Sequence, residues 1–242
     1  MKQNTNQVYQ DRLYLILAGI FISSLVSSNL IFQKFFFFTP FSFLMGENSS
    51  NWIAWLSGYS FELSVGILPY PITFLVTDIV SEIYGRRKAD EIVISGFIAS
   101  MFIMVVVLIG DMVVATKWSP VNNETFHHVF GLFGPAVFAS MIAYLSAQFV
   151  DIRIFHFWKK LTHGKHLWLR NNGSTIFSQL IDTCSVLFLL CYFGVIEWHK
   201  FGILFINGFL FKIFFAAFDT PIFYFITYFL RKLFGLKLGE EL

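Results

Sequence analysis

Long apolar runs, each about as long as a membrane-crossing helix, dominate this sequence of 242 residues. They lie at roughly 13–37, 63–84, 92–115, 130–150, 173–196 and 201–230, separated by polar or turn-forming residues. A helix needs about 20 apolar residues to cross about 30 Å of hydrocarbon, so the runs predict six transmembrane helices. We therefore expect an all-α membrane protein with one polytopic domain over 1–242.

Composition excludes other classes of protein. Only 13% of the residues are charged, whereas soluble domains carry about 25% charged residues. Six spans leave no room for an appended catalytic domain, and the absence of a GxxxxGK[ST] phosphate loop argues against direct use of ATP. No cysteine or histidine spacing indicates a metal, and a net charge of +2 gives no case for nucleic acid. We expect neither cofactor nor metal.

Lysines and arginines between the runs predict which side of the membrane each loop faces. Thirteen of them fall on one side: Lys2, Arg12, Arg86, Arg87, Lys88, Arg153, Lys159, Lys160, Lys165, Arg170, Arg231, Lys232 and Lys237. The opposite loops hold only Lys117 and Lys200. The positive-inside rule thus predicts cytoplasmic termini in a multi-pass protein of the cytoplasmic (inner) membrane. Two halves of three helices would then be oppositely oriented, as in inverted-repeat transporters.

Charged residues inside the predicted spans are the main functional signal. A charge near the bilayer centre costs at least about 2.5–3.5 kcal/mol, so such residues usually face a cavity, pair together or carry function. In the run 63–84, Asp78 and Glu82 share one helix face below a kink expected at Pro71. Asp78 is predicted about 12 Å deep and Glu82 near the interface. A structural alternative pairs Glu82 with Arg86.

The later runs add polar groups at a similar depth. Asp182 is predicted about 14 Å deep when residues are counted from Gly173. Gln179 precedes it by three residues on a polar stripe, and the run 201–230 contributes Lys212 and Asp219. Asp182 and Lys212 would alternatively be a purely structural buried pair.

The first and fourth runs carry further polar groups. The run 13–37 contributes Asn29 and Lys34, and Lys34 would alternatively snorkel to the interface. Asp151 follows the run 130–150 and is expected to be interfacial.

Four blocks of residues carry a family resemblance. The first contains Pro71, Thr73, Asp78, Ser81, Glu82, Tyr84 and Gly85, and the second Trp168, Arg170, Asn171, Ser174, Gln179 and Asp182. The others are Ser28, Asn29 and Lys34, and Gln148 with Asp151. Through these blocks the sequence resembles the queuosine-precursor transporter family, also called the vitamin-uptake-transporter family. It departs in having Tyr70 where the family often has Phe, and in a polar insertion around 46–60.

The resemblance implies import of 7-deazaguanine bases for salvage into tRNA: 7-cyano-7-deazaguanine, 7-aminomethyl-7-deazaguanine or queuine. A carboxylate accepts from the donor edge of such a base, and Lys, Asn or Gln meets its carbonyl. The candidate substrate-binding residues are Asn29, Lys34, Asp78, Gln179, Asp182 and Lys212. Candidates for gating or proton coupling are Asp78, Glu82 and Asp219. Pro71, Thr73, Tyr84, Gly85, Trp168, Arg170, Asn171 and Ser174 are expected to form the structural motif.

Alternatives to a secondary, proton-coupled carrier stay open at this point. The chain would alternatively be the substrate-binding subunit of an energy-coupling-factor complex, which depends on separate ATPases. An intramembrane aspartyl enzyme using Asp78 and Asp182 is a different class, but no motif for that chemistry occurs, so we do not expect an enzyme. The sequence leaves open the preferred deazapurine, the coupling ion, and whether the chain works as a monomer or a homodimer.

Overall fold

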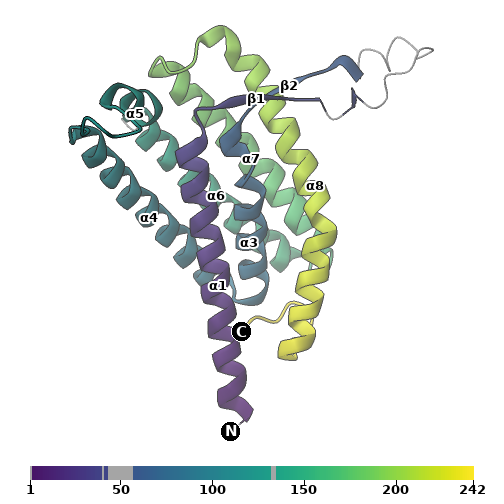
Figure 1. The fold of residues 1–242 in the computed structure, drawn as a ribbon. Coiled ribbons are helices and arrows are strands. Elements are labelled where there is room, and N and C mark those ends of the chain that lie inside the picture. Colours follow the sequence, from purple (N-terminus) through teal and green to yellow (C-terminus); the bar gives the residue numbers. More distant parts are fainter. Residues whose placement is uncertain (1, 40, 43–56, 132–134) are drawn as a thin grey trace.

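The computed structural model describes residues 2–39, 41–42, 57–131 and 135–242, which form a bundle of long helices (Figure 1). The helices are α1 (Lys2–Ile31), α3 (Tyr70–Ile83), α4 (Arg86–Met112), α5 (Asn123–Phe130), α6 (Pro135–Leu161), α7 (Leu167–Tyr192) and α8 (Phe201–Phe234). Two strands, β1 (Phe35–Phe38) and β2 (Phe61–Ser64), and two 3₁₀ turns, η2 (Val65–Ile67) and η3 (Trp198–Lys200), complete it.

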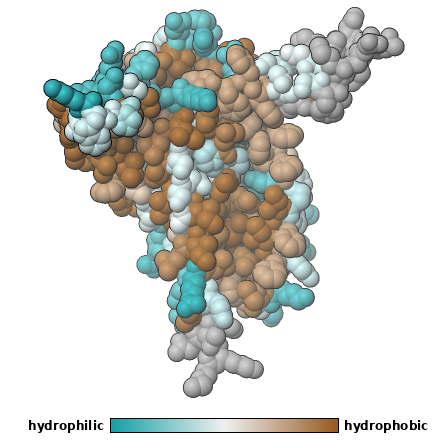
Figure 2. Space-filling model, viewed as in Figure 1, coloured by the Kyte–Doolittle hydropathy of each residue, from teal (hydrophilic) through white to brown (hydrophobic). Residues whose placement is uncertain are grey.

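The described residues include five segments that are long and apolar enough to cross a membrane. They are Gln7–Ile31, Val65–Ile83, Arg86–Met112, Leu167–Tyr192 and Trp198–Phe234. Figure 2 shows a broad hydrophobic surface along the middle of the molecule, with hydrophilic residues gathered toward its ends. The all-α membrane fold expected from the sequence is confirmed, with a two-stranded hairpin added to it.

The helices pack as two groups that are joined along their length. Helix α1 packs against α3 and α4, and α7 packs against both α6 and α8. Contacts of α3 with α8, and of α4 with α6, join the groups. Both ends of the chain lie at one end of the bundle, and β1 and β2 lie at the other (Figure 1).

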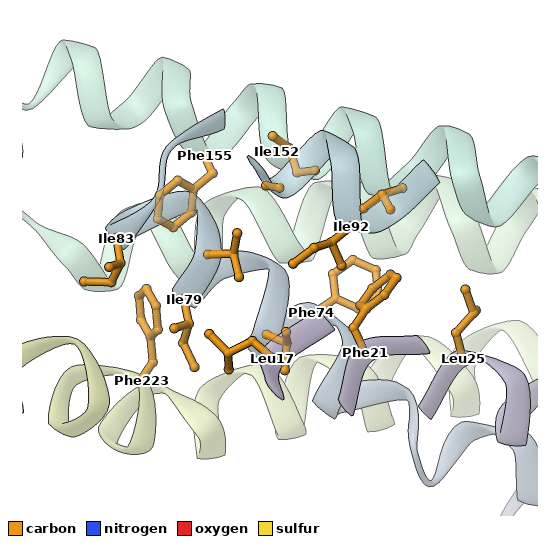
Figure 3. Close-up of a cluster of buried hydrophobic side chains, with 14 of the residues drawn as sticks. Leu17, Phe21, Leu25, Phe74, Ile79, Ile83, Ile92, Ile152, Phe155 and Phe223 are labelled. Atoms are coloured by element: carbon orange, nitrogen blue, oxygen red, sulfur yellow. The ribbon is translucent and has the colours of Figure 1, made fainter. Parts of the chain in front are cut away.

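The apolar core lies where α1, α3, α4, α6 and α8 meet (Figure 3). Leu17, Phe21 and Leu25 are spaced four residues apart on α1, so they share one helix face, and all three are buried. Gly96 lets α4 approach this face closely, because a Cβ there would lie 2.5 Å from the Phe21 ring. Small residues serve this purpose in membrane helices, whose association depends on close packing.

Several helix boundaries differ from the sequence prediction. The expected kink at Pro71 is wrong, because α3 begins at Tyr70 and proline occupies the first turn, where its missing N–H costs nothing. Helix α1 ends at Ile31, so Lys34 lies beyond the helix and beyond the segment Gln7–Ile31 that is apolar enough to cross a membrane. Helix α6 continues to Leu161, which places Asp151 well inside a helix. Helix α7 begins at Leu167, six residues before the predicted start of its span.

The hairpin occupies the end of the predicted run 13–37 and the start of the predicted run 63–84. Strands β1 and β2 are antiparallel, with Phe35 opposite Ser64 and Phe37 opposite Glu62. Four consecutive phenylalanines favour a strand as well as an apolar helix, and strand pairing gives their backbone groups partners. The sequence of the connection between the two strands also suggests a short interfacial helix with Trp52, Trp55 and Tyr59, of which Trp52 and Trp55 fall outside the described residues.

Candidate functional site

A cavity of about 190 Å³ lies between the hairpin and helices α1, α3, α6, α7 and α8. Most of its lining is apolar or aromatic, which is typical of small-molecule sites. The polar side chains that line it are Ser28, Asn29, Glu62, Ser64, Tyr70, Ser140, Tyr144, Asp182, Thr183 and Lys212. Three of the residues predicted to bind substrate therefore line one cavity, namely Asn29, Asp182 and Lys212.

An ion pair lies where this cavity borders the buried interior. Lys212 Nζ lies 2.6 Å from Asp182 Oδ2, and the Tyr70 hydroxyl donates to the same oxygen at 2.5 Å. Lys212 also donates to Thr183 Oγ1 at 3.0 Å and lies 4.3 Å from the centre of the Tyr70 ring. Asp182 is buried, and its other oxygen has no hydrogen-bond partner among the described residues. Asp182 therefore carries one buried acceptor that no described group satisfies.

Aromatic rings and amides complete the cavity wall near this ion pair. The rings of Tyr70 and Tyr144 pack edge to face, with their centroids 5.3 Å apart. Gln148 Nε2 donates to the Tyr144 hydroxyl at 2.6 Å, which holds that ring in place. Asn29, on α1, donates a hydrogen bond from Nδ2 to Ser100 Oγ at 3.3 Å. The side-chain carbonyl oxygen of Asn29 takes no part in this bond. The wall thus offers flat apolar faces beside hydrogen-bonding groups.

A much smaller void of about 20 Å³ adjoins the main cavity and shares Tyr70 and Lys212 with it. Gln179, Asp219 and Pro71 line this void and do not line the main cavity. The amide nitrogen and oxygen of Gln179 have no hydrogen-bond partner among the described residues. Gln179 therefore lies outside the cavity, in a void that meets it at Tyr70 and Lys212.

Three carboxyl groups form a separate buried layer: Asp78, Asp151 and Asp219 interact electrostatically with one another. Ser178 Oγ donates to Asp151 Oδ1 at 2.8 Å, whereas the described neighbour within hydrogen-bond reach of the Asp78 carboxyl group is the carboxyl group of Asp151. The expectation that Asp151 is interfacial is wrong, because its side chain is fully buried within the bundle. The aspartyl-enzyme alternative uses Asp78 and Asp182 together. In the structure Asp78 interacts with Asp151 and Asp219, whereas Asp182 pairs with Lys212.

Glu82 is the centre of a buried ion cluster near the end of the bundle that carries the chain termini. Arg170 Nη2 lies 3.1 Å from Glu82 Oε1, Arg231 contacts the same oxygen, and Lys159 Nζ lies 3.6 Å from Oε2. We call Glu82, Lys159, Arg170 and Arg231 the Glu82 cluster.

One prediction about Glu82 is wrong. The sequence offers Arg86 as an alternative partner for Glu82, but Arg86 pairs with Asp90 at 3.7 Å. Glu82 lies near the end of α3, and its side chain is fully buried. The cations of the Glu82 cluster come from α6, α7 and α8, so spacing within one helix did not indicate them.

The remaining residues of the predicted motif have structural contacts. Their hydrogen bonds are Thr73 Oγ1 to the Tyr70 carbonyl (2.7 Å), Tyr84 hydroxyl to the Gln10 carbonyl (2.7 Å), Trp168 N–H to the Tyr224 hydroxyl (2.9 Å), Asn171 Nδ2 to Thr220 Oγ1 (3.4 Å) and Ser174 Oγ to the Asn171 carbonyl (3.2 Å). Gly85 has a φ of 81°, a conformation that favours glycine, between α3 and α4. Lys34 accepts a backbone hydrogen bond from Val65 at 2.7 Å and does not line the cavity.

Sequence reasoning missed several residues of the site. In the sequence, Tyr70 stands out only as a departure from the family pattern, although it contacts both members of the ion pair. The sequence uses Lys159 and Arg231 only to predict which side of the membrane their loops face. Glu62 fell in a segment read as a loop, and no sequence signal placed it beside the cavity.

Comparisons with known proteins agree with this arrangement. The sequence profile of the family described as "Putative vitamin uptake transporter" matches residues 64–226, more than half of the chain. A "Probable queuosine precursor transporter" of Bacillus subtilis (strain 168) is 28% identical over 142 residues, 57% of this chain and 62% of that protein. A protein of the same description from Haemophilus influenzae is 27% identical over 164 residues, 64% of each chain.

The chain aligns with less than two thirds of the length of either relative. No solved structure matches it. The family profile and the several helices able to cross a membrane agree, and the chain belongs to the family described as putative vitamin uptake transporters and is a multi-pass membrane protein.

Proposed function

We propose that this chain imports 7-deazaguanine bases, the precursors of queuosine, across the cytoplasmic membrane. The observation that carries the proposal is the Asp182–Lys212 pair with Tyr70, set into the wall of an otherwise largely apolar cavity. The names of the two relatives refer to queuosine precursors and supply the substrate class. A buried, paired charge next to a cavity suits a polar ligand better than an apolar one.

The chemistry of a guanine-like base fits the groups in the cavity. Its N1–H and exocyclic amine form a donor edge for the carboxylate of Asp182, which lines the cavity. Its carbonyl is an acceptor for Lys212, and its flat faces suit the rings of Tyr70 and Tyr144. The volume, about 190 Å³, lies below the roughly 300–1,000 Å³ of pockets for drug-sized ligands. A small bicyclic molecule is therefore the appropriate size class.

An uptake competition tests this substrate class. The chain is expressed in a strain that lacks other queuosine salvage, and accumulation of labelled 7-aminomethyl-7-deazaguanine is measured with unlabelled competitors. We expect 7-deazaguanine bases to compete and folate to leave accumulation unchanged. Accumulation no greater than in cells with an empty vector would contradict the proposal.

The topology that we propose has six spans, with both termini in the cytoplasm and two oppositely oriented three-helix halves. Helix α6 supplies the sixth span, because its 27 residues extend about 40 Å at 1.5 Å per residue. Single cysteines at Ser119 and Thr162, in a variant lacking the native cysteines, test it. A membrane-impermeant thiol reagent added outside should label Ser119→Cys and leave Thr162→Cys unlabelled. The reverse pattern would refute the orientation.

For energy coupling we propose protonation of the buried carboxyl groups of Asp78 and Asp219, with Glu82 in a cytoplasmic gate. The support is the layer of Asp78, Asp151 and Asp219, which lacks a cation partner among the described residues, and the closed Glu82 cluster. In liposomes containing this chain alone, an inward proton gradient should drive accumulation and an uncoupler should abolish it. Accumulation that survives the uncoupler contradicts coupling, and activity only with added ATPases indicates the energy-coupling-factor alternative.

A further inference from the structure

Glu62 is a carboxylate beside the cavity that the proposed function does not use. It lies on β2 opposite Phe37 of β1 and lines the cavity together with its strand neighbours Leu63 and Ser64. The side chain of Glu62 is half-buried and has no hydrogen bond or ion pair with any other described residue. Its charge is available to a ligand.

The charges that line the cavity do not balance. Its lining includes two carboxylates, Glu62 and Asp182, and a single cation, Lys212. Lys212 lies 2.6 Å from Asp182, so this pair is neutral overall and leaves Glu62 uncompensated. Tyr70 and Tyr144, the other titratable residues of the lining, are neutral as phenols near pH 7. The lining thus carries a formal charge of −1.

We propose that Glu62 is a specificity-determining residue that selects deazaguanine bases bearing a protonated amine over neutral ones. This inference rests on the proposed function and adds which member of the substrate class the cavity favours. While Asp182 and Lys212 bind the polar edge of the base, Glu62 pairs with the amine of its side arm. Glu62 and Asp182 lie on different elements, β2 and α7, so they contact different parts of one ligand.

Two members of the substrate class separate this effect from recognition of the base itself. The aminomethyl arm of 7-aminomethyl-7-deazaguanine is a primary alkyl amine, which like lysine titrates near pH ~10 and is a cation at neutral pH. The nitrile arm of 7-cyano-7-deazaguanine is neutral. A carboxylate beside the arm therefore attracts the first base by Coulomb interaction and not the second.

The test measures direct binding of both bases to the purified full chain by isothermal titration. The wild-type chain should bind the aminomethyl base about tenfold more tightly than the cyano base. Glu62→Gln should weaken the aminomethyl base about tenfold and change the cyano base less than twofold, and Glu62→Asp should retain most of the preference. Glu197→Gln is the matched control, because Glu197 is an exposed carboxylate that does not line the cavity. It should change neither affinity.

The outcomes separate this inference from the proposed function. Retained binding of the cyano base shows that the Glu62→Gln variant is folded. If the wild-type chain binds both bases equally, or if Glu62→Gln changes both affinities equally, the role of Glu62 is overturned and the proposed function stands. If the wild-type chain binds neither base, both proposals fail. If a variant does not fold, the test is the affinity of the wild-type chain for the two bases. Equal affinities then overturn the inference, and tighter binding of the aminomethyl base supports it.

Discussion

At the scale of single residues, the most constrained group is the carboxylate of Glu82. It is fully buried and lies within 4 Å of three cations, Lys159, Arg170 and Arg231. Burying an ion is costly unless it is paired, and removing one partner leaves uncompensated charge in a medium of low dielectric constant. The Glu82 cluster therefore ties α3 to α6, α7 and α8 through charge.

Glu82→Gln should lower the free energy of unfolding by about 3–5 kcal/mol, because it leaves buried cations without their counter-ion. Chemical denaturation of the purified protein in detergent measures this change. Glu91→Gln is the matched control, since Glu91 pairs with Arg87 and Lys88 on the surface of α4. Surface pairs contribute about 0–1 kcal/mol, so equal effects of the two substitutions would contradict the structural role of the cluster.

The sequence predicted one buried ion pair and missed the partners of the other buried carboxylate. Counting residues along two runs predicts a similar depth for Asp182 and Lys212 and offers their pairing as a structural alternative, and the two side chains do lie 2.6 Å apart. The partners of Glu82 were not predictable in this way, because Arg170 and Arg231 are 88 and 149 residues away along the chain. Hydrophobicity gives the depth of a residue but not its neighbours on other helices.

At the scale of elements, the contact between α1 and α4 depends on a glycine. A Cβ at Gly96 would lie 2.5 Å from the Phe21 ring and 3.1 Å from Leu25, both on the core face of α1. Phe21 is fully buried, so its ring has little space into which to move. A side chain at position 96 would push these two helices apart.

Gly96→Ala should therefore destabilise the protein by about 1–3 kcal/mol, the range for overpacking a core. Gly19→Ala is the matched control, because Gly19 also lies in a helix but has open space where the Cβ would be. Since alanine favours helix, the control should be neutral or stabilising by up to about 1 kcal/mol. Thermal unfolding in detergent compares them, and a neutral Gly96→Ala would refute close α1–α4 packing.

Element types were more predictable than element boundaries. Each apolar run contains most of a long helix, because run length and hydrophobicity are strong signals. The β1–β2 hairpin was missed, since Phe35–Phe38 is apolar enough to read as a continuation of helix α1. Pro71 was read as a kink within a longer helix, whereas it lies in the first turn of α3.

At the scale of the whole molecule, the polar groups form successive layers within the bundle. The cavity adjoins the hairpin, and Tyr70 and Lys212 line both this cavity and the void that Gln179 and Asp219 also line. The carboxyl groups of Asp78 and Asp151 lie in the interior, and the Glu82 cluster contacts the C-terminal segment through Lys159 and Glu241, 2.8 Å apart. This order suits a carrier with a binding site on one side and a closed gate on the other.

The central claim is that the Asp182–Lys212 pair in the cavity binds the base, and affinity for 7-cyano-7-deazaguanine tests it most directly. This ligand is neutral, so its binding reports recognition of the base without the side arm. Titration of the purified protein should show at least tenfold weaker binding for Asp182→Asn than for the wild-type chain, because the variant replaces the carboxylate acceptor and its charge. Asp111→Asn, at the exposed end of α4, should leave the affinity unchanged. Equal affinity of Asp182→Asn and the wild-type chain would contradict the assignment.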